Sequence, residues 1–313
     1  MKLMFTSVGR RVELMQAFRA AAERIGAELA LYGADISESA PALYFCDKTV
    51  IVPKIRDENY IPFLIEVCER EKIDALIPTI DTDLLLLAKN RDRFGDTKVF
   101  IAASDKVALC RDKRLTADYF HSVGLRSPVP TDDVEKYDGG YPAFIKPRDG
   151  SSSIFAYRAE DGDSLRSLCA HVPDYIIQPF IRGTEYTVDA FCDLDGRPLL
   201  ITPRIRLAVR SGEVLKTEIA QDDRIIEEMH RLLADFRPRG QITVQLIRDG
   251  SGDDWYIEIN PRFGGGAPLS IKAGADSAEM LLRVVNGERP AYREKAAEDG
   301  AVYSRFDQSI RIR

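Results

Sequence analysis

With 313 residues, 45% of them hydrophobic and 30% charged, the chain has the composition of an ordinary globular protein and is long enough for two or three packed domains. Its formal net charge of −6 argues against nucleic acid and membrane surfaces as partners, and it favours a small ligand held in a local cleft. Five widely spaced cysteines without a C-x-x-C pair, and the lack of a signal-like or membrane-spanning apolar run, lead us to expect a cytoplasmic protein.

Strand and helix patterns alternate over residues 1 to about 105. The predicted strands cover residues 2–7, 28–35, 74–80 and 98–103, and the predicted helices cover residues 11–26, 59–72 and 84–94. This alternation indicates a parallel sheet with helices on both faces. The first strand-to-helix turn, Thr6 to Arg11, holds only one glycine of a dinucleotide-binding fingerprint, so an ordinary turn is favoured over a nicotinamide site.

Beyond residue 105 the pattern changes to hairpins. A helix at 106–124 and a proline-containing segment lead into strands at 141–147, 153–159 and 174–181, with a helix at 161–172. A long hairpin of 184–194 and 197–210, a helix at 224–236 and strands at 240–249 and 254–260 follow, and a last strand is expected at 304–312. We therefore place the first domain boundary in this region, near the change of composition.

A lysine ends one of these apolar strands, directly before a loop of glycine and serine. In FIKPRDGSSS (144–153), the ammonium of Lys146 supplies charge, and the N–H and hydroxyl groups of the loop can donate to phosphate oxygens. The residue order of a Walker A loop is absent. A polar hairpin loop after a lysine that reaches solvent explains the pattern equally well.

The apolar segment IIQPFIRGTEY (176–186) bends at Pro179 and Gly183 just before Glu185 begins a new strand. Extended backbone beside an apolar wall suits the edge of an adenine, and a carboxylate a few residues later can accept ribose hydroxyls. A strand that crosses between domains, with Glu185 in solvent, is an alternative that the spacing leaves open.

A third polar group lies in DWYIEINPRFGGG (254–266). Side chains alternate along a strand, so Glu258 and Asn260 share one face. The turn DGSGDD predicts antiparallel pairing with the preceding strand, which carries Gln245. Oxygen ligands of this kind suit Mg²⁺, which usually shares them with substrate phosphates. Taken alone, this strand face is better explained as a solvated polar face. Taken together with the lysine loop, it is better explained as a metal site.

Three arginines follow the strand period in ITPRIRLAVR (201–210). Arg204, Arg206 and Arg210 are predicted on one exposed face, where they would form an anion clamp for a carboxylate, a carbamate or a transferring phosphate. A hairpin with solvated arginines is an equally good interpretation.

The order of these features resembles the ATP-grasp superfamily, and within it one half of the carbamoyl-phosphate synthase large chain and biotin carboxylase. The resemblance runs from residue 1 to about 285, and the IEINPR motif after a VQ-containing strand is its most specific part. It implies an α/β fold with a Rossmann-like, parallel-sheet pre-ATP-grasp domain at 1–108. An α+β ATP-grasp part would follow, with a small lid subdomain at 109–183 and a large subdomain with a C-terminal tail at 184–313.

The resemblance also implies roles for single residues. Contacts to ATP would come from Lys113, Lys146, Asp149, Gly150, Ser151, Ser152, Ser153, Gln178, Pro179, Phe180, Ile181 and Glu185. In this set the lysines and the 149–153 loop would hold the triphosphate, Gln178 to Ile181 the adenine, and Glu185 the ribose. Gln245, Glu258 and Asn260 would ligate Mg²⁺ or Mn²⁺. Arg262 would steady the γ-phosphate and an acyl phosphate, and we count Arg206 as a second catalytic arginine.

The family chemistry implies transfer of the ATP γ-phosphate to a carboxylate, followed by attack of an amine on the acyl phosphate. One ATP-grasp unit without a glutaminase segment favours an ADP-forming carboxylate–amine ligase over carbamoyl phosphate synthesis. A split half of a synthase that works with a second chain, and an ATP-binding regulator without turnover, are the alternatives. An oxidoreductase is disfavoured by the missing glycines.

The substrates would be a small carboxylate and an amine whose identities the sequence leaves open. Besides Arg204 and Arg210, the run Gly264-Gly265-Gly266 would let backbone amides approach the acceptor without side-chain obstruction. Further contacts are expected from Ser7 to Arg11 and from Thr79 to Asp83, because strand ends of this kind face one cleft. A homodimer is compatible with the sequence, although no motif predicts one.

Overall fold

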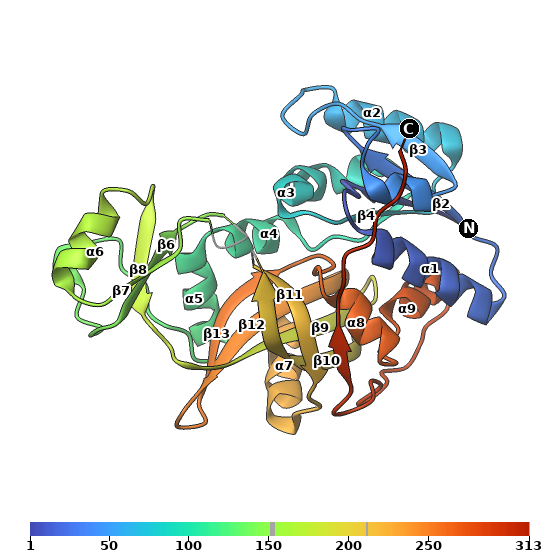
Figure 1. Cartoon of the computed structure of the whole chain (residues 1–313). Coiled ribbons are helices and arrows are strands. Elements are labelled where there is room, and N and C mark those ends of the chain that lie inside the picture. Colours follow the sequence, from blue (N-terminus) through green and yellow to red (C-terminus); the bar gives the residue numbers. More distant parts are fainter. Residues whose placement is uncertain (151–153, 211, 313) are drawn as a thin grey trace.

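The computed structural model describes residues 1–150, 154–210 and 212–312 (Figure 1). Its first part is a five-stranded parallel sheet with the strand order β3-β2-β1-β4-β5. The strands are β1 (Lys2–Thr6), β2 (Ala30–Asp35), β3 (Lys48–Ile51), β4 (Ala75–Pro78) and β5 (Lys98–Val99), and the helices are α1 (Val12–Ile25), η1 (Pro41–Phe45), α2 (Tyr60–Glu71), α3 (Asp81–Asn90) and η2 (Arg91–Phe94). The predicted parallel sheet is confirmed, although β3, a largely exposed edge strand, was not foreseen.

Strand β1 shows why this sheet is covered on both sides. Leu3 and Phe5 belong to one buried apolar cluster, and Met4 belongs to another. Successive side chains therefore feed opposite faces, as a buried parallel strand requires. In the strand order, β1 lies between β2 and β4, so the chain reverses its direction of winding between β1 and β4. Doubly wound sheets bind ligands outside the carboxyl ends of the strands at such a reversal. Here Thr6 and Thr79 at these strand ends are buried, and their hydroxyls donate to Asp83 and to the carbonyl of Thr6, respectively.

The single helix predicted at 106–124 is wrong, because the chain forms α4 (Ser104–Arg111) and α5 (Lys113–Ser122) instead. Asp112 between them has an extended backbone, and its side chain accepts a hydrogen bond from the N–H of Arg114. Aspartate is a strong N-cap because its carboxylate satisfies a free N–H of the first turn. The break places Lys113 at the first residue of α5.

A small antiparallel sheet follows, with the order β7-β6-β8. It consists of β6 (Ala143–Pro147), β7 (Tyr157–Ala159) and β8 (Tyr175–Pro179), together with η3 (Val134–Lys136) and α6 (Gly162–Cys169). The unit stands apart from the rest of the molecule, at the left of Figure 1, and has a small apolar cluster of its own that includes Ile145 and Leu165. The three predicted strands and the helix are confirmed, but β7 is shorter than expected.

The largest sheet has six strands in the order β13-β12-β9-β10-β11-β14. These are β9 (Gly183–Cys192), β10 (Pro198–Arg210), β11 (Glu213–Ile219), β12 (Gly240–Asp249), β13 (Asp254–Asn260) and β14 (Val302–Ser304), and the helices are α7 (Asp223–Phe236), α8 (Ala267–Lys272) and α9 (Ser277–Val285). The strand expected at 304–312 is wrong beyond Ser304, because residues 305–312 have no regular structure and run towards the parallel sheet (Figure 1).

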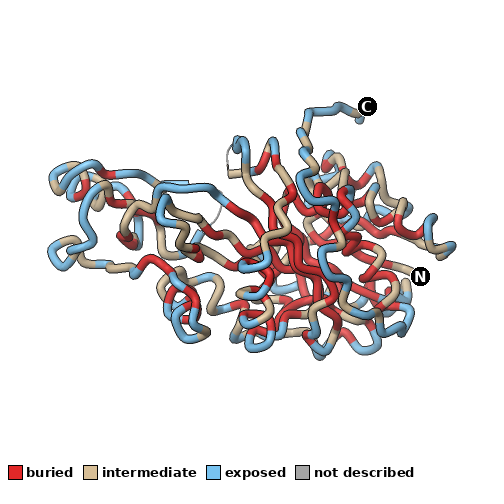
Figure 2. The backbone as a smooth tube through the Cα atoms, turned by 90° about the horizontal axis from the view of Figure 1, so that it is seen from below, coloured by how far each residue is buried: buried red, intermediate tan, exposed pale blue. Residues whose placement is uncertain are grey.

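One apolar cluster joins the parallel sheet to the helices beside the large sheet. The ring of Phe18 on α1 lies 4.8 Å from the ring of Phe5 and 5.8 Å from that of Phe263. We call the parallel sheet, the large sheet and the helices packed against them the body of the molecule. Figure 2 shows that buried residues are concentrated in this body and are sparse in the small unit. Among the helices that the structure describes, none combines the length and apolar character that a membrane crossing requires.

Candidate functional site

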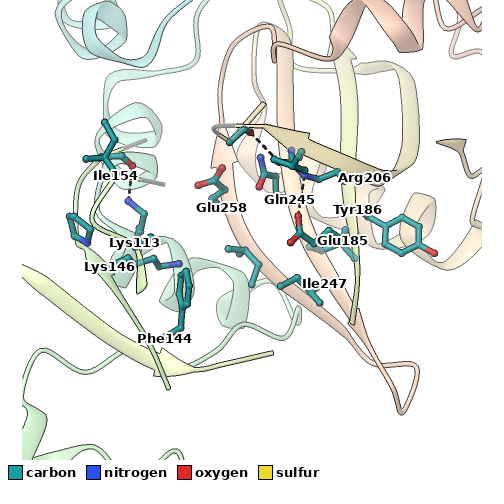
Figure 3. A pocket seen from close by; sticks show the side chains of 17 residues that line it. Lys113, Phe144, Lys146, Ile154, Glu185, Tyr186, Arg206, Gln245, Ile247 and Glu258 are labelled. Atoms are coloured by element: carbon teal, nitrogen blue, oxygen red, sulfur yellow. Dashed lines mark hydrogen bonds and ion pairs between the residues drawn. The ribbon is translucent and has the colours of Figure 1, made fainter. Parts of the chain in front are cut away.

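A cleft of about 300 Å³ separates the small sheet from the large sheet (Figure 3). Seven of the residues predicted from the sequence line it: Lys113, Lys146, Gly150, Glu185, Arg206, Gln245 and Glu258. The two lysines lie on the side of α5 and the small sheet, and Glu185, Arg206 and Gln245 lie on the side of the large sheet, with Glu258 facing the lysines (Figure 3). The fold thus brings cationic and oxygen-donor groups together from distant parts of the chain.

The two lysines form a desolvated cationic wall. Lys146 on β6 is buried, and burial lowers its pKa to about 8, although the nearby carboxylate of Glu258 acts in the opposite direction. Burial also lowers the pKa of Lys113, whose Nζ donates to the carbonyl of Gly150 at 2.8 Å. Each ammonium opposes the charging of the other, so a polyanion between them would relieve both.

The candidate metal ligands are neighbours on two paired strands. The predicted antiparallel pairing of their strands is confirmed, and Gln245 on β12 and Glu258 on β13 are direct cross-strand partners. The amide nitrogen of Asn260 donates to Glu258 Oε1 at 2.9 Å, and its oxygen accepts from Arg262 at 3.3 Å. One carboxylate and two amide oxygens are hard donors, and this small set suits Mg²⁺ that shares its shell with phosphate oxygens. The residues present therefore fit the expected ion.

Arg262 lies next to this donor set, and both Arg262 and Asn260 are outside the lining of the cleft. Its guanidinium makes a two-pronged ion pair with Asp81 at the start of α3, with N–O distances of 3.0 and 2.8 Å. Asp81 lies in the segment where substrate contacts were expected, but its role as the partner of Arg262 was missed. The two residues are 181 positions apart, and no local pattern links them.

The predicted nucleotide-base residues are only partly gathered at the cleft. Glu185 lines it and forms an ion pair with Arg206 at 3.2 Å. Gln178 to Ile181 do not belong to its described lining, and the side chain of the buried Gln178 donates to the carbonyl of Pro128 at 2.6 Å. The apolar lining, which the sequence reasoning missed, comes from Phe144, Ile154, Ala156, Tyr186, Leu246, Ile247 and Ile257. All were predicted in strands, which is wrong for Ile154 and Ala156 because β7 begins only at Tyr157, and which face meets the cleft was not predicted.

The residues of the loop after Lys146 do not all lie at the cleft. Gly150 lines the cleft, whereas Asp149 forms an ion pair with Arg111 at 2.7 Å on an exposed surface. Ser151, Ser152 and Ser153 lie outside the residues that the structure describes.

The expected exposed face of three arginines is not formed. Arg204 is buried, and its Nε lies 2.9 Å from Asp189, which also accepts hydrogen bonds from Thr243 and Ser270. Arg206 reaches the cleft, while Arg210 is exposed and pairs with Asp307. The register shifts near Ala208 interrupt the strand period that the prediction assumed. The prediction of one exposed cationic clamp is therefore corrected.

Close packing explains why glycine is needed at two of the three positions of the glycine run. A Cβ on Gly264 would lie 2.8 Å from Thr243 Oγ1, and a Cβ on Gly266 would lie 2.6 Å from a terminal nitrogen of Arg204. Only Gly265 has room, because its nearest neighbours would be Glu213 and Arg11 at 3.4 to 3.6 Å. The open side of the run is therefore the side of Gly265.

Two family models cover most of the chain. Residues 3–102 match the model described as the PylC-like N-terminal domain, and residues 110–266 match the model of the ATP-grasp domain. The second match includes the lysines, the candidate metal ligands and the glycine run. Both matches agree with the order of the parallel and antiparallel sheets.

Curated relatives resemble the chain at low identity. A 3-methyl-D-ornithine–L-lysine ligase of Methanosarcina mazei is 24% identical over 69% of this chain and 56% of its own length. The carbamoyl phosphate synthase large chain of Rubrobacter xylanophilus is 25% identical over 82% of this chain and 27% of its own length. The chain thus spans about half of the first relative and about a quarter of the second.

Solved structures share the fold. The biotin carboxylase domain of 2-oxoglutarate carboxylase from Hydrogenobacter thermophilus, which was crystallised with MgADP, ADP and bicarbonate, superposes with a TM-score of 0.72. That similarity covers 96% of this chain and 73% of the other, at 15% identity.

Proposed function

Since this chain belongs to the ATP-grasp family, we propose that it is an ATP- and magnesium-dependent ligase that joins a small carboxylate to an amine and releases ADP and phosphate. The observation that carries the proposal is the cleft in which Lys113 and Lys146 face the oxygen donors Gln245 and Glu258. A triphosphate needs cations on one side and a divalent ion on the other, and this cleft offers groups for both.

In this proposal the chain contributes positioning and counter-charge to two displacement steps. A carboxylate oxygen attacks the γ-phosphorus of ATP, the bond from that phosphorus to the bridging oxygen breaks, and ADP leaves. The amine then attacks the acyl carbon, the bond to the phosphate oxygen breaks, phosphate leaves, and the nitrogen loses a proton to solvent. Lys113, Lys146 and Arg206 would hold the phosphates, and Arg262 would neutralise the acyl phosphate.

Gln245, Glu258 and Asn260 would hold Mg²⁺, or Mn²⁺ in its place, which would neutralise charge on the phosphates when bound. Glu185 would accept the ribose hydroxyls after exchanging its ion pair with Arg206. Gly150 is a proposed ATP contact that already lines the cleft. Gln178, Pro179, Phe180, Ile181 and Asp149 remain proposed ATP contacts that require the small sheet to move towards the large one.

A second candidate is a synthase half that needs a partner chain, and it is favoured by the similarity to carbamoyl phosphate synthase over most of this chain. The relative that joins 3-methyl-D-ornithine to L-lysine favours the ligase, with amino acids as substrates. The assignment to the cytoplasm, the dimer and the domain limits at 108 and 183 stay predictions.

The deciding experiment measures ADP release from Mg-ATP over a panel of carboxylates paired with amines, with products followed by mass spectrometry. We expect release that requires one pair and a product lighter by one water than their sum. ADP release that depends on bicarbonate and a partner chain would favour the synthase half, and ATP binding without turnover on any pair would contradict the ligase.

A variant separates the metal assignment from folding. Glu258→Gln should lower turnover by at least about a hundredfold, since it removes the one carboxylate of the donor set. Metal-free ATP binding should be retained within a few-fold. The matched control is Glu160→Gln, which changes an exposed carboxylate paired with Arg158. Full activity of Glu258→Gln would refute the metal site.

A further inference from the structure

A guanidinium without an anionic partner lies at the turn after β1. Arg11 donates to the carbonyl of Thr79 at 2.9 Å, and none of the described carboxylates lies within 4.0 Å of it. Burial and the neighbouring charge of Arg262 lower the pKa of Arg11 to about 10, although the carboxylates of Glu213 and Asp81 act in the opposite direction. Two carboxylates act on Arg11 from nearby, but Arg262 already binds Asp81, and Glu213 is not within ion-pair distance of Arg11. An additional anion would stabilise this arrangement.

A carboxylate faces Arg11 across Gly265. A Cβ added to Gly265 would lie 3.6 Å from Arg11 Nη1 and 3.5 Å from Glu213 Oε1, so both groups border the same small space. They do not pair with each other. The described ionic partner of Glu213 is Arg305 at 3.3 Å, and the Glu213 side chain is 62% exposed, so that contact is weak and exchangeable. The gap therefore has a cationic wall, an anionic wall and a floor of glycine backbone.

Neighbours of Arg11 and Glu213 link this gap to the two clefts. Gly212 lines the nucleotide cleft, and the next residue, Glu213, lines a second cleft of about 740 Å³ on the other side of the β10–β11 hairpin. From Glu258, hydrogen bonds lead through Asn260 to Arg262, which is the charged neighbour of Arg11. An anion on Arg11 would thus lie beside the residue proposed to neutralise the acyl phosphate.

We propose that Arg11 and Glu213 bind the acid substrate as an α-amino acid, with its carboxylate on Arg11 and its ammonium on Glu213, over the backbone of Gly265. This inference rests on the proposed function and specifies which substrate is activated. A compact zwitterion matches two opposite charges that flank one glycine, whereas a carboxylate without an amine would add no contact to Glu213, which would keep only its exposed pair with Arg305. The side chain of the amino acid would extend into the second cleft.

The test uses hydroxylamine as the amine, so that the natural amine need not be known. ADP release and hydroxamate formation are measured for single α-amino acids and for the matched acids without the amine, such as alanine and propionate. We expect a preference of at least about tenfold for amino acids. Glu213→Gln should reduce that preference about tenfold by lowering kcat/KM for the amino acid alone, because only the ammonium loses its partner. Glu218→Gln, a carboxylate on the same strand, should leave it unchanged.

Two further variants keep the test independent of folding. Gly265→Ala places its Cβ at ordinary contact distance, so the protein should keep its Tm while the amino acid KM rises at least about tenfold. Arg11→Gln should weaken the binding of amino acids and of acids without an amine to the same extent, because both lose the partner of their carboxylate. Equal use of propionate and alanine, or an unchanged preference in Glu213→Gln, would overturn the inference while leaving the ligase intact. Absence of ADP release with every acid and amine would instead overturn the function, and the inference with it.

Discussion

At the scale of single residues, Lys146 combines a cost in stability with a proposed role in binding. Its pKa is lowered to about 8 by burial, so at pH 9 only about a tenth of the free protein carries the ammonium. Because bound triphosphate favours the charged form, we expect the Kd for ATP to rise about tenfold from pH 7 to pH 9. Lys146→Met should bind ATP at least about tenfold more weakly and lose this pH dependence. Titration calorimetry at the two pH values measures both effects.

The lowered pKa of Lys146 also predicts how the free energy of unfolding changes with pH. The folded protein binds the Lys146 proton less tightly than the unfolded chain, whose pKa is near 10.5. Wild-type stability should therefore rise between about pH 8 and pH 10.5 and be flat below, so far as this group is concerned. At pH 7 the burial of this ammonium lowers the free energy of unfolding by about 3 kcal/mol, and Lys146→Met should raise the free energy of unfolding by up to that amount. A less stable Lys146→Met protein at pH 7 would show that the ammonium is well compensated in the fold.

The sequence could predict residues whose neighbours are set by local rules. The strands of Gln245 and Glu258 were predicted to pair antiparallel because a short turn joins them, and the structure shows the two residues directly opposite each other. The partnership of Arg262 with Asp81 and the gap between Arg11 and Glu213 depend on how the parallel sheet docks against the large sheet. Strand period and turn type carry no information on that docking, so these pairs had to come from the structure.

At the scale of one element, β10 gives three arginines three different environments. The interior pair of Arg204 and Asp189 has side chains 2% and 3% exposed, whereas Arg210 and Asp307 are 57% and 64% exposed. Arg204→Ala would leave Asp189 buried without a counter-charge and should lower the free energy of unfolding by about 3–5 kcal/mol. Arg210→Ala on the same strand should cost less than about 1 kcal/mol. Urea denaturation measures both, and similar losses would contradict the difference in environment.

Elements were hardest to predict where one residue decides between continuing and stopping. The apolar period runs through 106–124, yet Asp112 caps a new helix and moves Lys113 to its first turn. Leucine, valine and arginine in β10 alternate as an ideal strand would, but the register shifts turn Arg210 away from Arg206. Residues 305–312 read as a strand, but the structure shows no regular element there. Capping and bulges are local events whose outcome depends on tertiary partners.

At the scale of the whole molecule, the described apolar clusters divide the chain into a body and a separate small unit. Phe18 joins the parallel sheet to Phe263, which precedes α8, and both belong to one cluster. Leu165 of α6 belongs to the small cluster with Ile145 and Ile177. Contacts between the body and the small unit therefore add little to either core, so we expect the small unit to open locally at a lower free energy than the body.

A pair of core substitutions tests this division by hydrogen exchange with mass spectrometry. Phe18→Ala should cost about 3–5 kcal/mol and speed exchange in both β1 and α8, with β6 and β8 unchanged, because the lost contacts belong to the body. Leu165→Ala should cost about 2–5 kcal/mol locally and speed exchange in β6 and β8 while β1 and α8 stay protected. In the wild type, Mg-ATP should slow exchange in β6 and β8 most, since ligand binding adds contacts to the unit that has the smallest core. If Leu165→Ala instead speeds exchange equally in β1 and α8, the two parts unfold as one, and closure of the cleft must involve the whole molecule.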